Sequence, residues 1–205
     1  MSRFVSKPHI VLYFSFLLLL TTSCRPKLDE KITAYQEAHN SGDVEKEMSF
    51  FAEDIKYDVI GQWKVTDKED LKKLAETDVV LNSHLIFTDI KSSKNKVTCK
   101  VEEENDLLKI CGIDKLYYEF RDFIFVDGLI KEVRTQPTQE GADALRNSYG
   151  AFGRWAAENR KEELDELRSA SVITKDNVGK WMELMRQWRE ESEKEKEKEG
   201  EKEEQ

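Results

Sequence analysis

Residues 117–135 read YYEFRDFIFVDGLIKEVRT, and the prediction of the fold starts from them. Aromatic and β-branched residues, which are typical of strands, stand on both sides of Asp127-Gly128. An Asp-Gly pair between two such runs is a strong signal for a tight hairpin turn. We therefore expect a long aromatic strand over 117–126 that returns, antiparallel, as a strand over 129–135.

Further strands are predicted upstream of this hairpin. Apolar and polar residues alternate over 55–59, which is the period of a half-buried strand. The same period runs over 79–92, where Lys94-Asn95-Lys96 turns the chain into a returning strand over 97–101. Residues 105–112 are expected to form an irregular crossing into the hairpin.

The beginning of the chain, by contrast, has helical spacing. Apolar side chains recur at intervals of four, three and four residues, which places them on one face of a helix. Residues 40–43 read NSGD and end this helix, and a second helix is expected over 44–51. A third, short helix is predicted over 66–74, where a capping box begins it. Helices and strands in this order predict an α+β fold, with helices on one face of a curved antiparallel sheet.

The chain after Pro137 is predicted to be helical. Apolar stripes recur at helical spacing over 142–155, at 164–167 and over 178–188. Their ordinary role is to pack on one another or on the sheet. From Glu190 onward, 13 of the last 16 residues are charged, nine Glu and four Lys. This tail either extends the last helix through Glu-to-Lys pairs or is disordered.

Charge and cysteine content exclude several classes of protein. The 205 residues include 33 Lys+Arg and 42 Asp+Glu, for a formal net charge of −9, whereas nucleic-acid binding needs a basic face. Three cysteines are too few for a disulfide scaffold, and without metal-type Cys/His spacing we expect neither metal nor cofactor. Cys99 and Cys111 either pair or remain free. We favour two free buried thiols, because Cys99 alternates with Val97 and Val101.

Residues 1–23 have the architecture of an export signal. Two basic residues precede an apolar run over 10–20 that is too short to remain as a membrane span. The small residues before Cys24 resemble the lipobox of bacterial lipoproteins, although Thr21 stands where leucine is usual. The resemblance implies cleavage before Cys24 and lipid on its thiol, which would anchor the protein in the bacterial cell envelope, on the outer membrane where the cell has one. An ordinary cleaved signal and an uncleaved anchor remain alternatives.

Three motifs resemble the nuclear transport factor 2-like (NTF2-like) superfamily, and within it the SnoaL-like and ketosteroid isomerase-like group. They are Asn40-Ser41-Gly42-Asp43, Phe51-Ala52-Glu53-Asp54-Ile55 and Phe125-Val126-Asp127-Gly128-Leu129-Ile130. The resemblance implies a cone, in which a strongly bent antiparallel sheet wraps around N-terminal helices and an apolar cavity. The chain then divides into a signal peptide (1–23), a tether (24–27), the cone domain (28–136), a C-terminal helical extension (137–189) and a charged low-complexity tail (190–205).

The same resemblance shows where ketosteroid isomerase-like enzymes carry their catalytic groups. Their phenol donor falls on Tyr35, their carboxylate base on Val59 and their neutral acid on Arg121. Valine accepts no proton, and arginine does not become neutral. Asp58 lies beside Val59 but points to the opposite face of its strand. We therefore expect no catalytic residue of this type and favour a protein that is not an enzyme.

Two functions from different classes follow. The first is a non-catalytic binder of a small apolar ligand or a protein partner. Its pocket would be lined by Tyr35, Phe51, Tyr57, Val59, Phe87, Arg121, Phe123 and Phe125. The alternative is that the same residues fill the cone as ordinary core and leave no cavity. The second is an isomerase, dehydratase or cyclase with non-standard catalytic residues. A dimer formed through the sheet is a further possibility.

Tyr35 and Arg121 suggest the chemistry of the ligand. By the resemblance, both face the cavity, where a phenol beside a guanidinium would hold an oxyanion such as the carboxylate of an apolar acid. The alternative is that Arg121 points outward and pairs with Glu119, Asp122 or Glu102. The register of the strands separates these two possibilities.

Overall fold

The computed structural model describes residues 27–170 and 173–203. The predicted signal peptide and Cys24 lie outside these residues. Within them, no helix is both long enough and apolar enough to cross a membrane.

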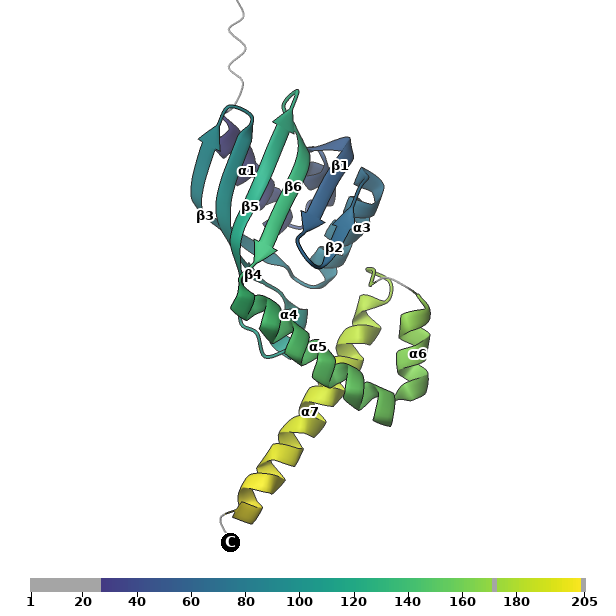
Figure 1. The fold of residues 1–205 in the computed structure, drawn as a ribbon. Helices are drawn as coiled ribbons and strands as arrows, with labels where there is room; N and C mark the ends of the chain where they lie inside the picture. Colours follow the sequence, from purple (N-terminus) through teal and green to yellow (C-terminus); the bar gives the residue numbers. More distant parts are fainter. Residues whose placement is uncertain (1–26, 171–172, 204–205) are drawn as a thin grey trace, which may run out of the picture.

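Six strands form one curved sheet in the order β2-β1-β6-β5-β4-β3 (Figure 1). The strands are β1 (Phe51–Val59), β2 (Trp63–Val65), β3 (His84–Ser93), β4 (Lys96–Glu104), β5 (Leu116–Val126) and β6 (Leu129–Pro137). The predicted β5–β6 hairpin is antiparallel and occupies the middle of the sheet. The β1–β6 pair is parallel. The expectation of a wholly antiparallel sheet is therefore wrong at this one pair.

The sheet bends where its strands change register. Such shifts occur at 88–91 in β3, at 99–101 in β4 and at 118–120 in β5. Asp89 adopts a positive φ of 53° within the first of them. An extra residue in one strand of a pair bends that strand and increases its twist. The result is a concave face that must be covered by other elements.

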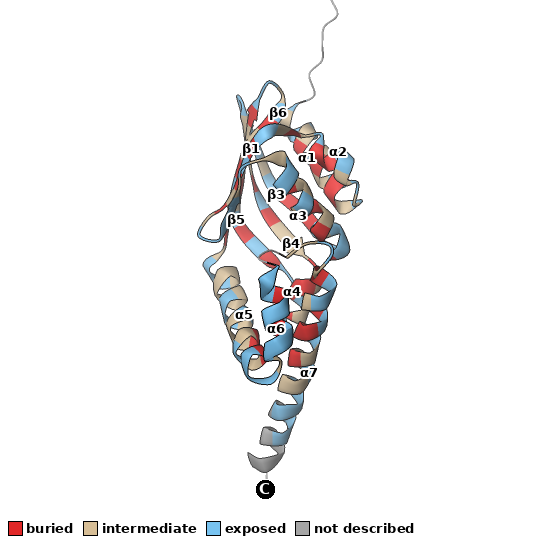
Figure 2. Ribbon diagram, turned by 90° about the vertical axis from the view of Figure 1, so that its right-hand side faces the viewer, coloured by how far each residue is buried: buried red, intermediate tan, exposed pale blue. Residues whose placement is uncertain are grey.

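Helices α1 (Leu28–Asn40), α2 (Val44–Met48) and α3 (Lys68–Val80) cover the concave face (Figure 2). The predicted stripe of α1 places Ile32 and Tyr35 in the core. Asp43 caps α2, as expected, by accepting a hydrogen bond from the Lys46 backbone at 3.0 Å. Phe51, predicted as the end of this second helix, is instead the first residue of β1.

Helix α3 continues past its predicted end at residue 74, and β3 begins at His84, not at Val79. Leu71 and Ala75 are buried on one helical face, whereas Val79 is 43% exposed. Packing of the helix thus outweighs the strand propensity of its last residues. Asn82, with a φ of 51°, then turns the chain into β3.

The expected irregular crossing contains a short helix, α4 (Asp106–Ile110). Asn105 caps it by accepting a hydrogen bond from the Leu108 backbone at 2.8 Å. Leu107 and Leu108 are both buried, but they face different clusters, the first toward the extension and the second toward the cone. The helix therefore links the two cores.

The C-terminal extension has a hydrophobic core of its own. It consists of α5 (Gln139–Asn159), α6 (Lys161–Ser169) and α7 (Val178–Glu203), which lie beyond one end of the sheet (Figure 1). Its fully or nearly fully buried side chains include Phe152, Leu164, Val178, Met185 and Trp188. Leu81, Leu107 and Cys111 from the cone join this cluster and hold the extension against it.

Two open alternatives are settled by the structure. Cys99 and Cys111 are buried and free, as favoured. The charged tail continues α7 as far as Glu203, and Arg189 pairs with Glu193 one helical turn on, at 2.9 Å. Near its start, Glu191 accepts a hydrogen bond from Trp155 Nε1 at 2.9 Å and pairs with Arg160 at 3.0 Å. The start of the tail, at Glu191, therefore still contacts the end of α5.

Replacing Trp188 with alanine should lower the free energy of unfolding by about 3–5 kcal/mol, because a large aromatic side chain leaves the second core. Trp181 is only partly buried, so Trp181→Ala should cost less. Chemical denaturation measures both. A chain ending at residue 193 is the control and should differ from the full chain by less than about 0.5 kcal/mol. A loss near zero for Trp188→Ala would show that α7 does not pack as described.

Candidate functional site

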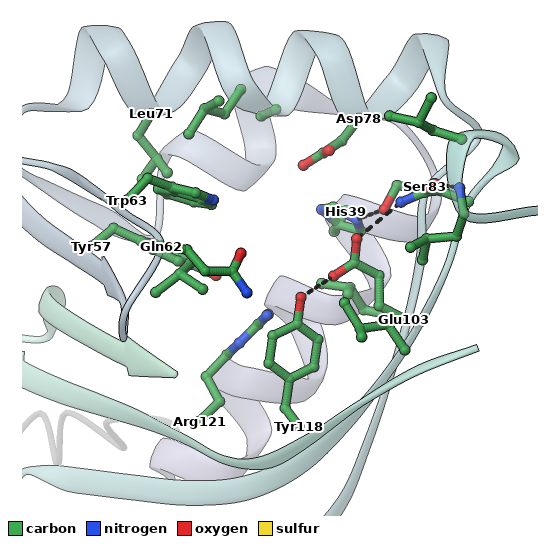
Figure 3. A pocket seen from close by; sticks show the side chains of 18 of the residues that line it. His39, Tyr57, Gln62, Trp63, Leu71, Asp78, Ser83, Glu103, Tyr118 and Arg121 are labelled. Atoms are coloured by element: carbon green, nitrogen blue, oxygen red, sulfur yellow. Dashed lines mark hydrogen bonds between the residues drawn. The ribbon is translucent and has the colours of Figure 1, made fainter. Parts of the chain in front are cut away.

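A cavity of about 420 Å³ lies between the cone and the C-terminal extension. The concave face of the sheet, α1 and α3 form most of its wall (Figure 3). Leu145 and Tyr149 of α5, together with Ile173, close it from the side of the extension. The cavity is therefore not a property of the cone alone.

Only half of the expected pocket residues line this cavity. Tyr35, Tyr57, Val59 and Arg121 do so. Phe51, Phe87, Phe123 and Phe125 do not, and this part of the prediction is wrong. They belong to the core of the cone.

The reason is aromatic packing around Tyr35. Phe51 and Phe123 meet its ring edge-on, with centroids 5.4 and 5.8 Å away. Phe87 stacks on it at 5.9 Å. These separations are those of well-packed aromatic pairs. The rings fill one end of the cone and leave its other end open.

Arg121 reaches the cavity from β5 and is only 3% exposed. Its neighbours Asp122 and Glu102 pair elsewhere, with Lys96 at 2.8 Å and Lys115 at 3.0 Å. The outward ion pairs considered as an alternative for Arg121 are not formed. Within the described part of the chain, no carboxylate lies within 4.0 Å of its guanidinium.

Instead, aromatic faces surround the guanidinium of Arg121. Its Cζ lies 5.1 Å from the ring centroid of Tyr118, 5.8 Å from that of Phe87 and 5.9 Å from that of Tyr57. Such cation–π contacts lower the cost of burying the charge. The Nε–H donates a long hydrogen bond of 3.4 Å to Thr135 Oγ1. The rest of the guanidinium points into the cavity (Figure 3).

Two phenols add hydrogen-bond donors to the wall. The hydroxyls of Tyr35 and Tyr57 have no hydrogen-bond partner among residues 27–170 and 173–203. Burial raises the pKa of both, that of Tyr57 to about 12, so both phenols stay protonated at neutral pH. Together with Arg121, they offer donors to an acceptor inside the cavity.

The carboxylate of Glu103 accepts one hydrogen bond at each oxygen. Tyr118 donates its hydroxyl to Glu103 Oε2 at 2.7 Å, and Asn105 Nδ2 donates to Oε1 at 3.0 Å (Figure 3). The cap of α4 and the wall of the cavity are thereby joined through Asn105. These bonds hold the Glu103 side chain in place in the wall.

A chain of three side chains forms the opposite wall. His39 Nδ1 lies 3.1 Å from Glu47 Oε1, and His39 Nε2 lies 3.3 Å from Ser83 Oγ. All three residues are buried. Burial by itself lowers the pKa of His39, but the hydrogen bond and the charge of Glu47 outweigh it and raise the pKa. The chain ties α1 and α2 to the turn between α3 and β3.

Asp78, from the last turn of α3, was not predicted as a site residue. The residue as a whole is half-buried, but its carboxylate faces into the cavity (Figure 3). Among the described residues it forms neither a side-chain hydrogen bond nor an ion pair. Burial raises its pKa to about 7. The charge of His39 and, less strongly, that of Arg121 oppose this rise, whereas the charges of Glu103 and Glu47 add to it.

A signal for Asp78 was present in the sequence. Leu71, Leu74, Ala75 and Asp78 follow one another at helical spacing, so a carboxylate stands on the apolar stripe of α3. The prediction ended this helix at residue 74 and began the next strand at Val79. Asp78 fell between the two elements and was not placed on the inward face of a helix.

Replacing Glu47 with glutamine should destabilise the protein more at pH 6 than at pH 9. The pKa of His39 is higher in the folded chain than its unfolded value of about 6.5, so the ion pair contributes fully below that pH and is lost as the pH rises through the folded value. We expect about 3–5 kcal/mol at pH 6, as for a broken buried pair, and at most about 1 kcal/mol at pH 9. Urea denaturation at both values measures this. Glu53→Gln, at an exposed carboxylate, should show no such difference, and equal losses for Glu47→Gln at both values would refute the pairing.

Comparisons with known proteins find only distant similarities, all of them among solved structures. No family model and no curated protein matches the chain. Among solved structures, a putative ketosteroid isomerase from Kribbella flavida matches with a TM-score of 0.45 at 17% identity, over 53% of this chain and 75% of the other. An NTF2-like protein from Cytophaga hutchinsonii matches with a TM-score of 0.47 at 8% identity, over 56% and 93%. An epoxide hydrolase-like protein from M. tuberculosis matches with a TM-score of 0.48 at 13% identity, over 60% and 92%.

The first two of these proteins carry names from the group that the sequence motifs resemble. The α+β architecture of the structure is the one predicted from the order of helices and strands. At such identities the likeness concerns the fold alone. With TM-scores below 0.5, nothing about activity, substrate or partner follows from it.

Proposed function

We propose that the chain is a lipid-anchored protein of the bacterial cell envelope that binds a small organic acid in the cavity without converting it. The observation that supports this most strongly is Arg121, a buried cation that faces the cavity without a carboxylate partner. The same guanidinium replaces the neutral acid that an isomerase of the resembled type needs.

An unpaired charge in a buried site is costly, and a carboxylate from a ligand would remove much of that cost. The planar guanidinium suits this role, since it offers parallel donors to both carboxylate oxygens. Tyr35 and Tyr57 would add neutral donors from the neighbouring wall. A bound acid would thus meet three side chains that lack other partners for these groups.

The rest of the wall favours a ligand with an apolar body. Leu71, Leu85 and Leu116 line the cavity, as does Trp63, which stacks on Tyr57 with centroids 5.5 Å apart. A volume of about 420 Å³ lies within the range of ordinary small-molecule sites. We therefore favour a compact acid with an aromatic or aliphatic part.

The alternative is an isomerase, dehydratase or cyclase with non-standard residues. Asp78 favours it, because a cavity carboxylate with a pKa of about 7 is suited to accept and return a proton at neutral pH. Conversion of a bound acid into a product, lost in Asp78→Asn, would establish this second function. Binding without conversion supports the first.

Replacing Arg121 with leucine should weaken the binding of apolar carboxylic acids by about 10- to 100-fold, which corresponds to the loss of a charge-assisted hydrogen bond. Native mass spectrometry of the full chain, with matched acids and methyl esters, measures it. The esters should bind weakly to both proteins. Circular dichroism verifies that the variant is folded.

Arg134→Leu is the matched control, since Arg134 is exposed on the adjacent strand β6 and should leave binding unchanged. Arg121→Lys keeps the charge but loses the planar fork and should give an intermediate affinity. Equal binding of acids and esters by the native chain, or binding of neither, would contradict the proposal.

The anchor is tested separately at Cys24. Expression in a bacterial host with labelled palmitate should give a protein that carries label and partitions into detergent, and Cys24→Ala should abolish both. Cys99→Ser, at a buried thiol inside the cone, should retain the label. Native protein without an acyl chain by mass spectrometry would show that the lipobox interpretation is wrong.

A further inference from the structure

The cavity contains one acidic and one basic side chain that form no ion pair with any described residue. Asp78 approaches from α3 and Arg121 from β5, and the two charged groups face each other across the cavity (Figure 3). They do not form an ion pair with one another, since no guanidinium nitrogen of Arg121 lies within 4.0 Å of a carboxylate oxygen of Asp78. The space between them is bounded by Gln62 and by the ring of Tyr118.

The other carboxylates of the wall already have partners inside the chain. Glu47 pairs with His39, and Glu103, which keeps its charge, accepts hydrogen bonds from Tyr118 and Asn105. This leaves Asp78 and Arg121 as an opposite pair whose cavity-facing groups have no partner among the described residues. A ligand with an acidic group alone would pair with Arg121 and leave Asp78 without a partner.

We propose that the ligand is an amino acid or a similarly small amino carboxylate, with its carboxylate on Arg121 and its ammonium on Asp78. The inference deepens the proposed function and rests on it for the position of the carboxylate. It adds a second charged contact, on the opposite wall, that a fatty acid or a plain aromatic acid would not make.

Two physical arguments favour a cation at Asp78. The last turn of a helix carries a partial negative charge. Asp78 lies in the last turn of α3, and that turn contains no basic residue. A nearby positive charge also stabilises the ionised form of a buried carboxylate such as that of Asp78. An ammonium group would interact favourably with both the helix end and the Asp78 carboxylate, whereas a second carboxylate would be repelled by both.

The proton balance on binding distinguishes the two kinds of ligand. The charged side chains that act on the carboxylate of Asp78 are those of His39, Glu47, Glu103 and Arg121. Near pH 7 Asp78 carries about half a proton, because its pKa is about 7. An ammonium favours the ionised form, lowers the pKa and releases protons. A ligand with a carboxylate alone disfavours the ionised form, raises the pKa and takes protons up.

Isothermal titration calorimetry of the full chain in detergent tests this at pH 7, in two buffers of different ionisation enthalpy. The probes are phenylalanine, 4-aminobutyrate and 6-aminohexanoate, which vary the spacing of the charges, and 3-phenylpropanoate, which is phenylalanine without its amino group. We expect at least one amino carboxylate to bind tenfold or more tightly than 3-phenylpropanoate, and to release up to about half a proton. 3-Phenylpropanoate should take protons up.

The variant Asp78→Asn assigns the effect to its residue. It is isosteric, and since it removes a buried carboxylate that has no side-chain partner, it should fold with equal or higher thermal stability. It should lose the tenfold preference and most of the proton release, while the affinity for 3-phenylpropanoate is kept or rises. Asp114→Asn, at an exposed acid outside the cavity, should behave as the native chain.

Failure of this inference is distinguishable from failure of the proposed function. If acids bind through Arg121 but amino carboxylates show no preference, or if Asp78→Asn leaves their affinity unchanged, the inference is overturned and the proposed function stands. If amino carboxylates bind equally well to Arg121→Leu, the placement of the carboxylate is wrong and both fall. Binding of none of the four probes overturns the inference as well.

Discussion

The aromatic packing around Tyr35 is the constraint on which the rest of the structure depends. Phe51, Phe87 and Phe123 close on this ring and fill one end of the bent sheet. A sheet that curves around such a cluster encloses more space than α1 and α3 can fill at its other end, and there the cavity remains. The extension closes that end through α5, so the cavity depends on both cores.

The sequence predicted those parts of the fold that short-range patterns determine. The Asp127-Gly128 hairpin and the stripe of α1 follow from turn chemistry and helical spacing, and both are present. The parallel β1–β6 pair was missed because no local pattern specifies which strands become neighbours. Likewise, Val79 and Val80 have the composition of a strand, and only the packing of Leu71 and Ala75 keeps them in a helix.

The candidate site was harder to predict than the fold, and the reason is physical. Whether an aromatic residue fills a core or lines a cavity is decided by volumes that the sequence does not contain. Phe123 and Tyr57 share the pattern of inward strand residues and both belong to the core of the cone, yet only Tyr57 also lines the cavity. Arg121 was found through the family resemblance, which places it at the position of the neutral acid. Asp78 stands on the apolar stripe of α3 and was missed because the helix was predicted to end too early.

The polar groups of the cavity are of two kinds, which affect the stability of the folded chain in opposite directions. Satisfied groups, such as His39 with Glu47 and Tyr118 with Glu103, contribute to stability and fix the walls. Arg121 and Asp78 have no ion-pair partner among the described residues, and burial of a charge without an opposite charge destabilises the folded chain. A protein retains such a cost where function requires it, and binding of a ligand that pairs both charges returns the lost stability to the folded state. The polar groups that fix the walls are thus hydrogen-bonded, while two opposite charges inside the cavity form no ion pair. This arrangement is expected of a preorganised binding site and not of a loosely packed core.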